Sequence, residues 1–472
     1  MTIRAALFRR KSVALLQAEA AQRGELRRVL GLWQLTAIGL GGIIGVGIFV
    51  LTGTVAATQA GPAVVLSFLI AGIASAAAAL CYAEFAGLIP VSGSAYTYGY
   101  AVLGEFAGWI IGWDLLLEYA LIAAVVAVGW SGYVQALLDT FHVPLPVWAQ
   151  GAWGSAPGRL FNLPAVLISL AITALLAVRM EWGARFNTLI VAIKIGAAAL
   201  IVIAGVAFVD PARWHPFMPF GMHGVVTGAA IVFFAVFGYD MLTTAAEEAK
   251  NPQRDLPRAV ILSLAIAMAL YFAICLVLTG IVPYASLNND APVAHAFTAI
   301  GLPQVMIAIS LASICGITSV IFANLLAGAR IWFALSRDGL LPGWFAAVHP
   351  RWRTPHRTTL LLGLVTAVAA GLFPLDELAK LVNIGVLGAF IVICSAVAVL
   401  RRRQPELPRP FRTPLVPFVP IVGIGFSCWL IWGLPYTTYL RFLAWLLIGC
   451  IVYFGYGLRH SRLATANGDI RP

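Results

Sequence analysis

Glycines interrupt the first long apolar stretch of the sequence. Five of them fall within nine residues, from Gly39 to Gly47, in the run IGLGGIIGVGIF. Glycine destabilises a helix by about 1 kcal/mol relative to alanine, and unwound backbone frees N–H groups for an anion and carbonyl groups for a cation. The run therefore predicts either a ligand site built from the backbone between Gly41 and Gly47, or a face of small residues for close helix packing.

A second interruption lies in the sixth apolar stretch, which reads FFAVFGYD at residues 233–240. Here Gly238 precedes Tyr239 and Asp240. We expect the Asp240 carboxylate either to cap the second half of a broken helix, because carboxylates accept hydrogen bonds from N–H groups at helix starts, or to act with Tyr239 as a gate. Paired interruptions at corresponding places in two halves of a chain are typical of a binding site between inverted repeats.

Three ionisable residues lie deep inside apolar stretches. Lys194 stands in RFNTLIVAIKIGAAAL, and Asp114 and Glu118 are spaced i, i+4 and so share one helix face. A charged group at the centre of a bilayer costs at least about 2.5–3.5 kcal/mol, and such groups are commonly functional. We therefore interpret Lys194 as a proton carrier, with a purely structural role as the alternative. Glu84, at the end of a stretch, is instead expected to pair with loop arginines.

The composition requires lipid around most of these elements. Of the 472 residues, 61% are apolar and 10% are charged, whereas soluble domains have about 45–50% and 25%. The net charge of +11 does not indicate a nucleic-acid partner, because the basic residues occupy short segments between apolar stretches and form no basic face on a soluble domain. The sequence thus predicts an all-α integral membrane protein.

Twelve apolar stretches are candidates for transmembrane helices, each of which needs roughly 20 residues. The third and the eighth are longer than a bilayer requires and should tilt or protrude. The predicted spans are residues 31–56, 62–89, 101–137, 162–178, 186–209, 222–246, 258–283, 298–334, 358–375, 378–400, 415–433 and 438–458.

The positions of Lys and Arg set the predicted orientation. Twenty-five of the 30 basic residues precede the first span, follow the last, or lie in loops on that same side. Arg159, Arg213, Lys380 and Arg441 fall on the opposite side, and Lys194 lies within a span. Cytoplasmic loops carry an excess of basic residues. Both termini are therefore predicted to be cytoplasmic, in a multi-pass protein of the cell's inner membrane.

Four sequence runs resemble the amino acid–polyamine–organocation (APC) superfamily. They are IGLGGIIGVGIFVLTG in the first span, YAEFAGLIPVSGSAYTY at the end of the second, FFAVFGYDMLTTAAEEAKNPQRDLPRA from the sixth onwards, and ALSRDGLLP after the eighth. The EEAKNPQRDLPRA run and the GITSV of the eighth span are most similar to the bacterial cationic amino acid transporter branch. The resemblance covers residues 30–400.

The resemblance implies a LeuT-like fold, which is an inverted 5+5 helix repeat followed by two extra C-terminal helices. The implied organisation is a cytoplasmic N-terminal segment (1–29), a first five-helix repeat (30–210), a second repeat (211–400), a cytoplasmic loop (401–414), two accessory helices (415–458) and a cytoplasmic tail (459–472). The basic loop is interpreted as a topology determinant, with contact to anionic lipid as the alternative.

The resemblance also implies how the two interruptions bind an amino acid. The substrate carboxylate is expected at the N–H groups near Val46 and Gly47. Lys194 is implied to stand where sodium-coupled relatives hold a cation, and Glu118 is similar to a third-span glutamate suited to a proton relay. The carbonyl groups expected to meet the substrate ammonium are those of Ile43, Phe234, Ala235 and Phe237.

Polar residues of the eighth span leave two questions open. Thr318 and Ser319 could serve a sodium site or simply bond backbone carbonyls. Asn324 is expected to line the pocket for the substrate side chain, where it would suit a longer or cationic substrate, or to bond a neighbouring helix.

Together these features predict a secondary active transporter that takes up neutral or cationic amino acids across the cytoplasmic membrane by alternating access, coupled to protons. The alternative is an amino acid or polyamine exchanger without proton drive. An enzyme is not indicated, because the seven histidines are scattered in or near loops and termini and no nucleophile, base or metal set clusters. No cofactor or metal is expected. A channel would show a repeated filter segment or a ring of charges.

Overall fold

The computed structural model describes Arg9 and residues 30–89, 94–178, 184–350 and 354–462. Within these ranges the chain forms helices joined by turns and loops, and extended pairing is limited to two isolated bridges, Leu30 with Ala249 and Gln150 with Asn162. The prediction of an all-α fold is confirmed.

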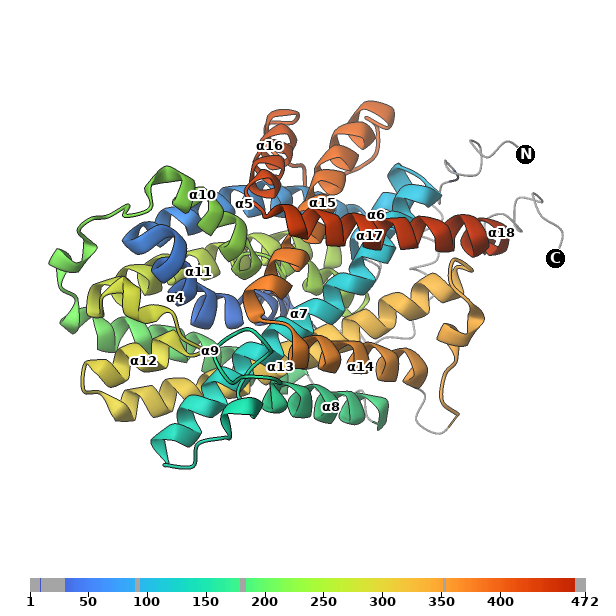
Figure 1. Ribbon diagram of the computed structural model, residues 1–472. Helices are drawn as coiled ribbons and strands as arrows, with labels where there is room; N and C mark the ends of the chain where they lie inside the picture. The colour runs from blue at the N-terminus through green and yellow to red at the C-terminus, as the bar shows by residue number, and fades with distance from the viewer. Residues whose placement is uncertain (1–8, 10–29, 90–93, 179–183, 351–353, 463–472) are drawn as a thin grey trace.

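Several helices run lengthwise through the bundle, and the longest of them, α7, crosses it diagonally (Figure 1). The α-helices are α3 (Leu32–Ile43), α4 (Thr52–Val55), α5 (Val64–Leu88), α6 (Ser94–Val102), α7 (Glu105–Thr140), α8 (Leu163–Val178), α9 (Ala184–Gly205), α10 (Gly221–Val232), α11 (Pro252–Ile281), α12 (Pro292–Ala299), α13 (Pro303–Arg337), α14 (His356–Leu372), α15 (Leu375–Arg403), α16 (Phe418–Trp432), α17 (Tyr436–Val452) and α18 (Leu458–His460).

Many of these helices suit a bilayer. Among the described residues, eight helical segments are long and apolar enough to cross a membrane, and four shorter apolar helices, α3, α8, α14 and α16, accompany them. With 36 and 35 residues, α7 and α13 are longer than the roughly 20 residues that a helix needs to cross a bilayer. The chain is therefore a multi-pass membrane protein whose third and eighth predicted spans have the extra length that the sequence indicates.

Two predicted spans each contain a break that the sequence pattern does not show. The sequence pattern predicts one helix over 101–137, whereas α6 ends at Val102 and α7 starts only at Glu105, after Gly104 with φ 116°. The stretch 298–334 is likewise divided between α12 and α13 by Gly301, with φ 78°. Glycine adopts a positive φ readily and other residues do not, so the chain turns at these two glycines.

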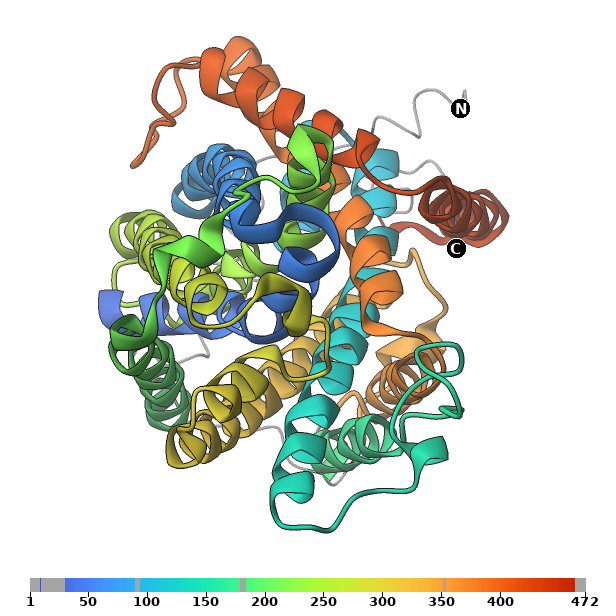
Figure 2. The ribbon, with the colours of Figure 1, turned by 60° about the vertical axis from the view of Figure 1, so that its left-hand side comes forward.

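The helix α7 lies at the centre of the bundle. In its most apolar stretch 89% of the residues are buried, against 17% in the segment Tyr436–His460 that contains α17. Figure 2 accordingly shows α17 at the edge of the bundle, away from α5 and α11. The central helix is thus the element against which both halves of the chain can pack.

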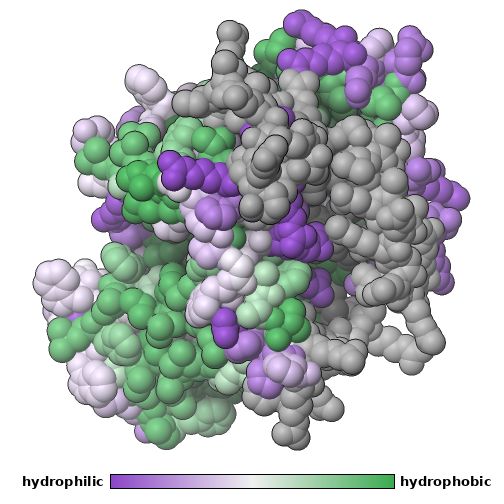
Figure 3. Space-filling view, turned by 90° about the vertical axis from the view of Figure 1, so that its right-hand side faces the viewer, coloured by the Kyte–Doolittle hydropathy of each residue, from purple (hydrophilic) through white to green (hydrophobic). Residues whose placement is uncertain are grey.

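The outer faces of the peripheral helices are apolar. Leu167, Ile203, Leu364 and Ile451 are each more than half exposed, as expected for side chains that lipid covers. The end of the bundle that carries α18 is different, because hydrophilic side chains gather there beside a hydrophobic area (Figure 3).

A fully buried carboxylate ties four segments together at that end. Glu105, at the start of α7, accepts hydrogen bonds from Tyr100 (3.1 Å), Tyr453 (3.0 Å) and Ser461 (2.6 Å). Its carboxylate also lies 3.9 Å from the guanidinium of Arg9, whose carbonyl accepts the Glu105 N–H. Residues near both ends of the chain therefore meet at Glu105, and we call this group the Glu105 cluster.

A second ion-pair group lies at the end of α5. Glu84 is buried and pairs with Arg401 (2.7 Å) and Arg409 (3.1 Å), and it accepts the backbone N–H of Thr413. The expected pairing of Glu84 with loop arginines is confirmed. The basic segment 401–414 is in this way fixed against the bundle.

Replacing Glu105 by alanine should lower the thermal stability of the protein. The change leaves the Arg9 charge and three hydroxyl groups without their common partner, and removing one member of a buried ion pair costs roughly 3–5 kcal/mol. Glu377→Ala is the control, because its pair with Arg441 is partly exposed and such pairs contribute about 0–1 kcal/mol. Thermal unfolding in detergent should show a clearly lower midpoint for Glu105→Ala only. Equal midpoints for the two variants would contradict the role of the cluster.

Candidate functional site

The first apolar stretch folds as two helical pieces with a break between them. α3 ends at Ile43, and Ile44 is extended with φ −77° and ψ 103°. The second piece begins with a π-helical turn at Gly47–Leu51 and continues through α4 to a further π-helical turn at Ala56–Ala60. The interruption that the glycine run predicts is therefore present, directly after α3.

The sixth apolar stretch is broken in a similar way. α10 is followed by a 3₁₀ turn at Phe233–Ala235, and the chain resumes a 3₁₀ helix at Tyr239–Glu248. Between them Gly238 has φ 106°, a conformation that strains any residue with a Cβ atom. The second predicted interruption is thus present, and Gly238 is the residue that permits it.

The two breaks lie directly against each other. A Cβ atom at Gly42 would overlap the carbonyl oxygen of Gly238, and one at Gly47 would overlap Ala235. In the other direction, a Cβ atom at Gly238 would lie 2.7 Å from the carbonyl carbon of Gly42. Both interpretations of the glycine run therefore hold: the glycines let two backbones pack closely, and the backbone between them is unwound.

Backbone polar groups without partners gather at this contact. Four consecutive N–H groups at the first break, residues 45–48, donate no backbone hydrogen bond within the described part of the chain. The carbonyl oxygens of Phe234, Ala235 and Phe237 at the second break likewise accept none there. Free backbone groups at membrane depth are tolerated where they line a cavity or a site. The arrangement offers donors to an anionic group and acceptors to a cationic one.

Two tyrosine hydroxyl groups donate hydrogen bonds to backbone carbonyl groups beside the first break. Tyr271 of α11 donates to Ile43 at 2.8 Å, and Tyr133 of α7 donates to Phe49 at 2.8 Å. The Ile43 carbonyl, which the resemblance assigns to a substrate ammonium, thus already has one partner, and a carbonyl oxygen can accept a second.

Two polar side chains similarly hold carbonyl groups before and within the second break. Ser75 of α5 donates to Val236, and Asn383 of α15 donates to Ala230 (2.7 Å) and Ile231 (3.1 Å). The sequence interpretation missed Ser75 and Asn383, as it missed Tyr133 and Tyr271. The only signal was a polar side chain inside an apolar stretch, which is a pointer to function or internal bonding.

Lys194 is joined to the first break. Its side chain is 1% exposed, and its ammonium donates to the carbonyl of Gly41 at 2.9 Å. The stem packs on α13, because a Cβ atom at Gly316 would lie 2.7 Å from the Lys194 Cγ. Lys194 therefore connects α9, α3 and α13 at a carbonyl group three residues before the unwound segment.

The buried carboxyl groups of Asp114, Glu118 and Asp240 form a second cluster of ionisable side chains. Glu118 lies within electrostatic range of Asp114 and Asp240, and the Tyr119 hydroxyl is 3.5 Å from Asp240. Within the described ranges no salt bridge reaches any of the three acids, and no hydrogen bond or salt bridge joins Glu118 to Lys194. The two residues that the sequence predicts as proton carriers are therefore not bonded to each other there.

The structure places Asp240 and Tyr239 at the start of the second helical piece of the sixth stretch. Asp240 lies in the first turn of that piece, whose N-cap position is occupied by Gly238 rather than by Asp240. Tyr239 is buried and donates to the Ser75 carbonyl at 3.1 Å, and its ring packs against Phe390. Its hydroxyl group holds α5 and the broken segment together.

Polar residues of α13 bond their own helix. The Asn324 amide donates to Val320 at 2.8 Å, so the expected hydrogen bond to a neighbouring helix is absent from the described structure. Thr318 and Ser319 donate to carbonyl groups of their own helix, at 2.7 Å each. Short hydroxyl and amide side chains commonly make such local bonds.

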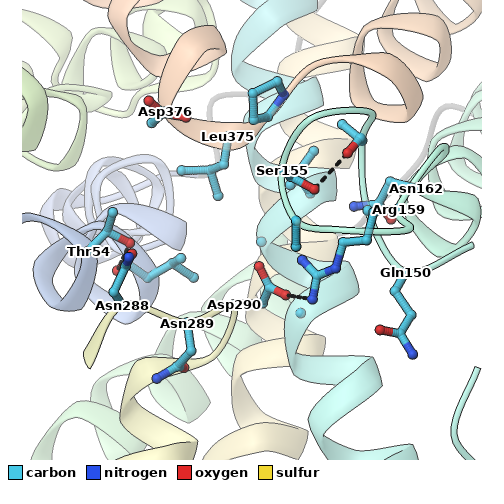
Figure 4. A pocket seen from close by; sticks show the side chains of 18 of the residues that line it. Thr54, Gln150, Ser155, Arg159, Asn162, Asn288, Asn289, Asp290, Leu375 and Asp376 are labelled. Carbon is cyan, nitrogen blue, oxygen red and sulfur yellow. Dashed lines mark hydrogen bonds and ion pairs between the residues drawn. The ribbon is translucent and has the colours of Figure 1, made fainter. Parts of the chain in front are cut away.

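A cavity of about 740 Å³ lies beside the first break, at the far end of α7 from Glu105 (Figure 4). Val50 and Thr54 line it from the second helical piece, and Gly129 lines it from α7. Val46 packs directly on Gly129, since a Cβ atom there would overlap its side chain. A valine side chain thus separates the cavity from the free N–H groups.

Comparison with known proteins matches this architecture to one family. Residues 30–456 match the model of the amino acid permease family. The chain belongs to the amino acid permease family. The match covers both broken stretches of this permease and ends within its last long helical segment.

Curated relatives of this permease are transporters. It is 50% identical to the methylthioribose transporter of Bacillus subtilis (strain 168) over 97% of this chain and 99% of the relative. It is 46% identical to the branched-chain amino acid permease BcaP of the same organism, over 98% and 100%. A cationic amino acid transporter 4 from Mus musculus is 31% identical over 94% and 89%. The resemblance to cationic amino acid transporters is confirmed, and no relative among these is an enzyme.

Glycine substitutions test the contact between the two breaks. Gly47→Ala should abolish transport by this permease, because the added Cβ atom would overlap Ala235 and force the broken segments apart. Gly45→Ala is the matched control in the same break, because its Cβ atom would make an ordinary contact of 3.6 Å with Val320. Uptake by cells with equal surface expression measures both. Loss of uptake in both variants, or in neither, would contradict the packing argument.

Proposed function

We propose that this permease takes up amino acids by holding the substrate's zwitterionic backbone between the two breaks. The carboxylate is bound by N–H groups at Val46 and Gly47. The ammonium is bound by carbonyl groups at the second break and at Ile43. The observation that carries the proposal is that free donors and free acceptors lie on two backbones in direct contact, which matches the two charges of a zwitterion without any charged side chain.

The proposal includes twelve spans in an inverted 5+5 repeat with two accessory helices. In the first repeat (30–210) the broken stretch precedes α5, α7, α8 and α9, and in the second (211–400) it precedes α11, α13, α14 and α15. Corresponding helices have similar lengths: 36 and 35 residues for α7 and α13, and 16 and 17 for α8 and α14. Alternating access then follows as movement of one bundle against the other around the two breaks.

The proposed orientation puts the Glu105 cluster on the cytoplasmic side of the inner membrane and the 740 Å³ cavity on the outer side. The distribution of Lys and Arg along the sequence supports it, because 25 of the 30 basic residues belong to the side predicted to be cytoplasmic. Arg401 and Arg409 are among them. The cavity would then be the vestibule through which a substrate enters.

Coupling to protons is proposed through Lys194. The Lys194 ammonium donates a hydrogen bond to the Gly41 carbonyl at 2.9 Å. Lys194 is buried within a predicted membrane helix, where an ionisable group is energetically costly and is commonly functional. Loss of its proton would weaken that hydrogen bond and so loosen the first helical piece next to the break. Glu118 would act as a proton relay, and Asp240 as a cap or gate at the second break.

The proposed substrates are amino acids with neutral, branched apolar side chains. The branched-chain permeases of Bacillus subtilis and Lactococcus lactis are 46% and 36% identical to this chain over 98% and 92% of its length. Phe234 and Phe237 lie edge to face at the second break, with ring centres 5.5 Å apart, and such rings suit an apolar side chain.

Counterflow in proteoliposomes tests the proposed function directly. Vesicles preloaded with leucine should accumulate labelled leucine, and isoleucine and valine should compete with it better than arginine does. Methylthioribose is the discriminating competitor, because one close relative bears its name. Exchange of methylthioribose without exchange of any amino acid would overturn the proposal.

Lys194→Ala should separate binding from proton coupling. The variant removes the group that links the break to the proton gradient and leaves the free backbone groups in place. We expect leucine counterflow to persist while accumulation driven by an inward proton gradient is lost. Lys380→Ala is the control, because Lys380 pairs with Asp376 at 2.8 Å near the start of α15, and it should retain both activities. Full pH-driven accumulation in Lys194→Ala would contradict its assigned role.

A further inference from the structure

The cavity beside the first break contains a charged pair that the proposed site does not use. Arg159, in the loop between α7 and α8, lies 2.7 Å from Asp290, in the loop before α12 (Figure 4). Both residues line the 740 Å³ cavity. The pair thus joins loops from the two proposed repeats across the cavity.

The pair is accessible from the cavity and easily exchanged. The side chains of Arg159 and Asp290 are 20% and 50% exposed, and ion pairs with such access to water contribute about 0–1 kcal/mol. Another carboxylate can therefore replace Asp290 on the guanidinium at little cost. The planar fork of an arginine suits a carboxylate better than a lysine ammonium does, because it donates two parallel hydrogen bonds.

Both members of the pair are held in position by glycine contacts. A Cβ atom at Gly151 would lie 2.8 Å from the Arg159 Cδ, so the side chain runs along the backbone of its own loop. A Cβ atom at Gly132 of α7 would overlap the carbonyl oxygen of Asp290. A guanidinium fixed in this way is a preorganised receptor.

The cavity also leads from Arg159 towards the free N–H groups. Gly129 lines the cavity and touches Val46 at the first break. Arg159 and the N–H groups of residues 45–48 are both donors to a carboxylate. An anionic group released by Arg159 would have a second set of donors on the inner side of Val46.

We propose that the vestibule is a first binding site for the substrate, in which the α-carboxylate of an amino acid displaces Asp290 from Arg159 before it passes to the break. The inference rests on the proposed function and adds the residue that receives the substrate. The exchange is balanced in charge, since one carboxylate replaces another and the released Asp290 is solvated. Arg159 thereby supplies the guanidinium for a carboxylate in this cavity, while the two other acidic lining residues, Asp376 and Glu377, pair with Lys380 and Arg441.

Initial uptake rates in intact cells test the proposal. Arg159→Gln should raise the KM for leucine about tenfold, the loss expected for one charge-assisted hydrogen bond, while kcat stays within about twofold of wild type. The KM of Arg159→Lys should lie between those of the wild type and Arg159→Gln, because a lysine retains the positive charge but cannot donate two parallel hydrogen bonds. Arg213→Gln, which removes a cation whose acidic partner Asp210 also lies outside the cavity lining, should leave KM unchanged. Surface expression is matched for all variants.

Asp290→Asn separates carboxylate capture from a structural tie between the loops. If Arg159 receives the substrate, freeing it from Asp290 leaves KM unchanged or lowers it. A rise in KM for Asp290→Asn equal to that for Arg159→Gln would overturn the proposal, and so would an unchanged KM in Arg159→Gln. Absence of leucine uptake by the wild type would instead overturn the proposed function, so the two failures are distinguishable.

Discussion

The structure depends on the close contact of two interrupted helices inside the membrane. Gly42, Gly47 and Gly238 leave no room for a Cβ atom at this contact, so the two backbones meet where neither can complete its helical hydrogen bonds. In lipid, free N–H and carbonyl groups are costly unless another group satisfies them. In the proposed function these same free groups bind a molecule that carries both charges.

Side chains of the surrounding helices offset the cost of free backbone groups at some positions of the breaks and not at others. Tyr271, Tyr133, Ser75 and Asn383 satisfy carbonyl groups around the breaks, and Lys194 satisfies the one at Gly41. The N–H groups of residues 45–48 receive no such partner from the described backbone. The protein thus satisfies some carbonyl groups at each break and leaves other backbone groups free, which is the preorganisation that binding a small ligand requires.

The sequence was informative where local chemistry decided the structure. The glycine run and Gly238 indicated both breaks, since few other residues tolerate unwound or left-handed backbone. Boundaries at Gly104 and Gly301 were missed, because an isolated glycine in an apolar stretch does not reveal its φ angle. Asn324 could not be placed, because its choice between its own helix and a neighbour depends on packing. The partners Tyr271 and Asn383 come from distant helices, and no local pattern connects them to the breaks.

The account's central claim is that backbone groups of the two breaks recognise both charges of an amino acid. Competition in leucine counterflow tests it most directly, with N-acetyl-leucine, which lacks the ammonium, and leucine methyl ester, which lacks the carboxylate. The account predicts that each loses nearly all ability to compete, while valine, with both charges and a shorter side chain, competes well. Competition by either blocked analogue at the level of leucine itself would contradict it.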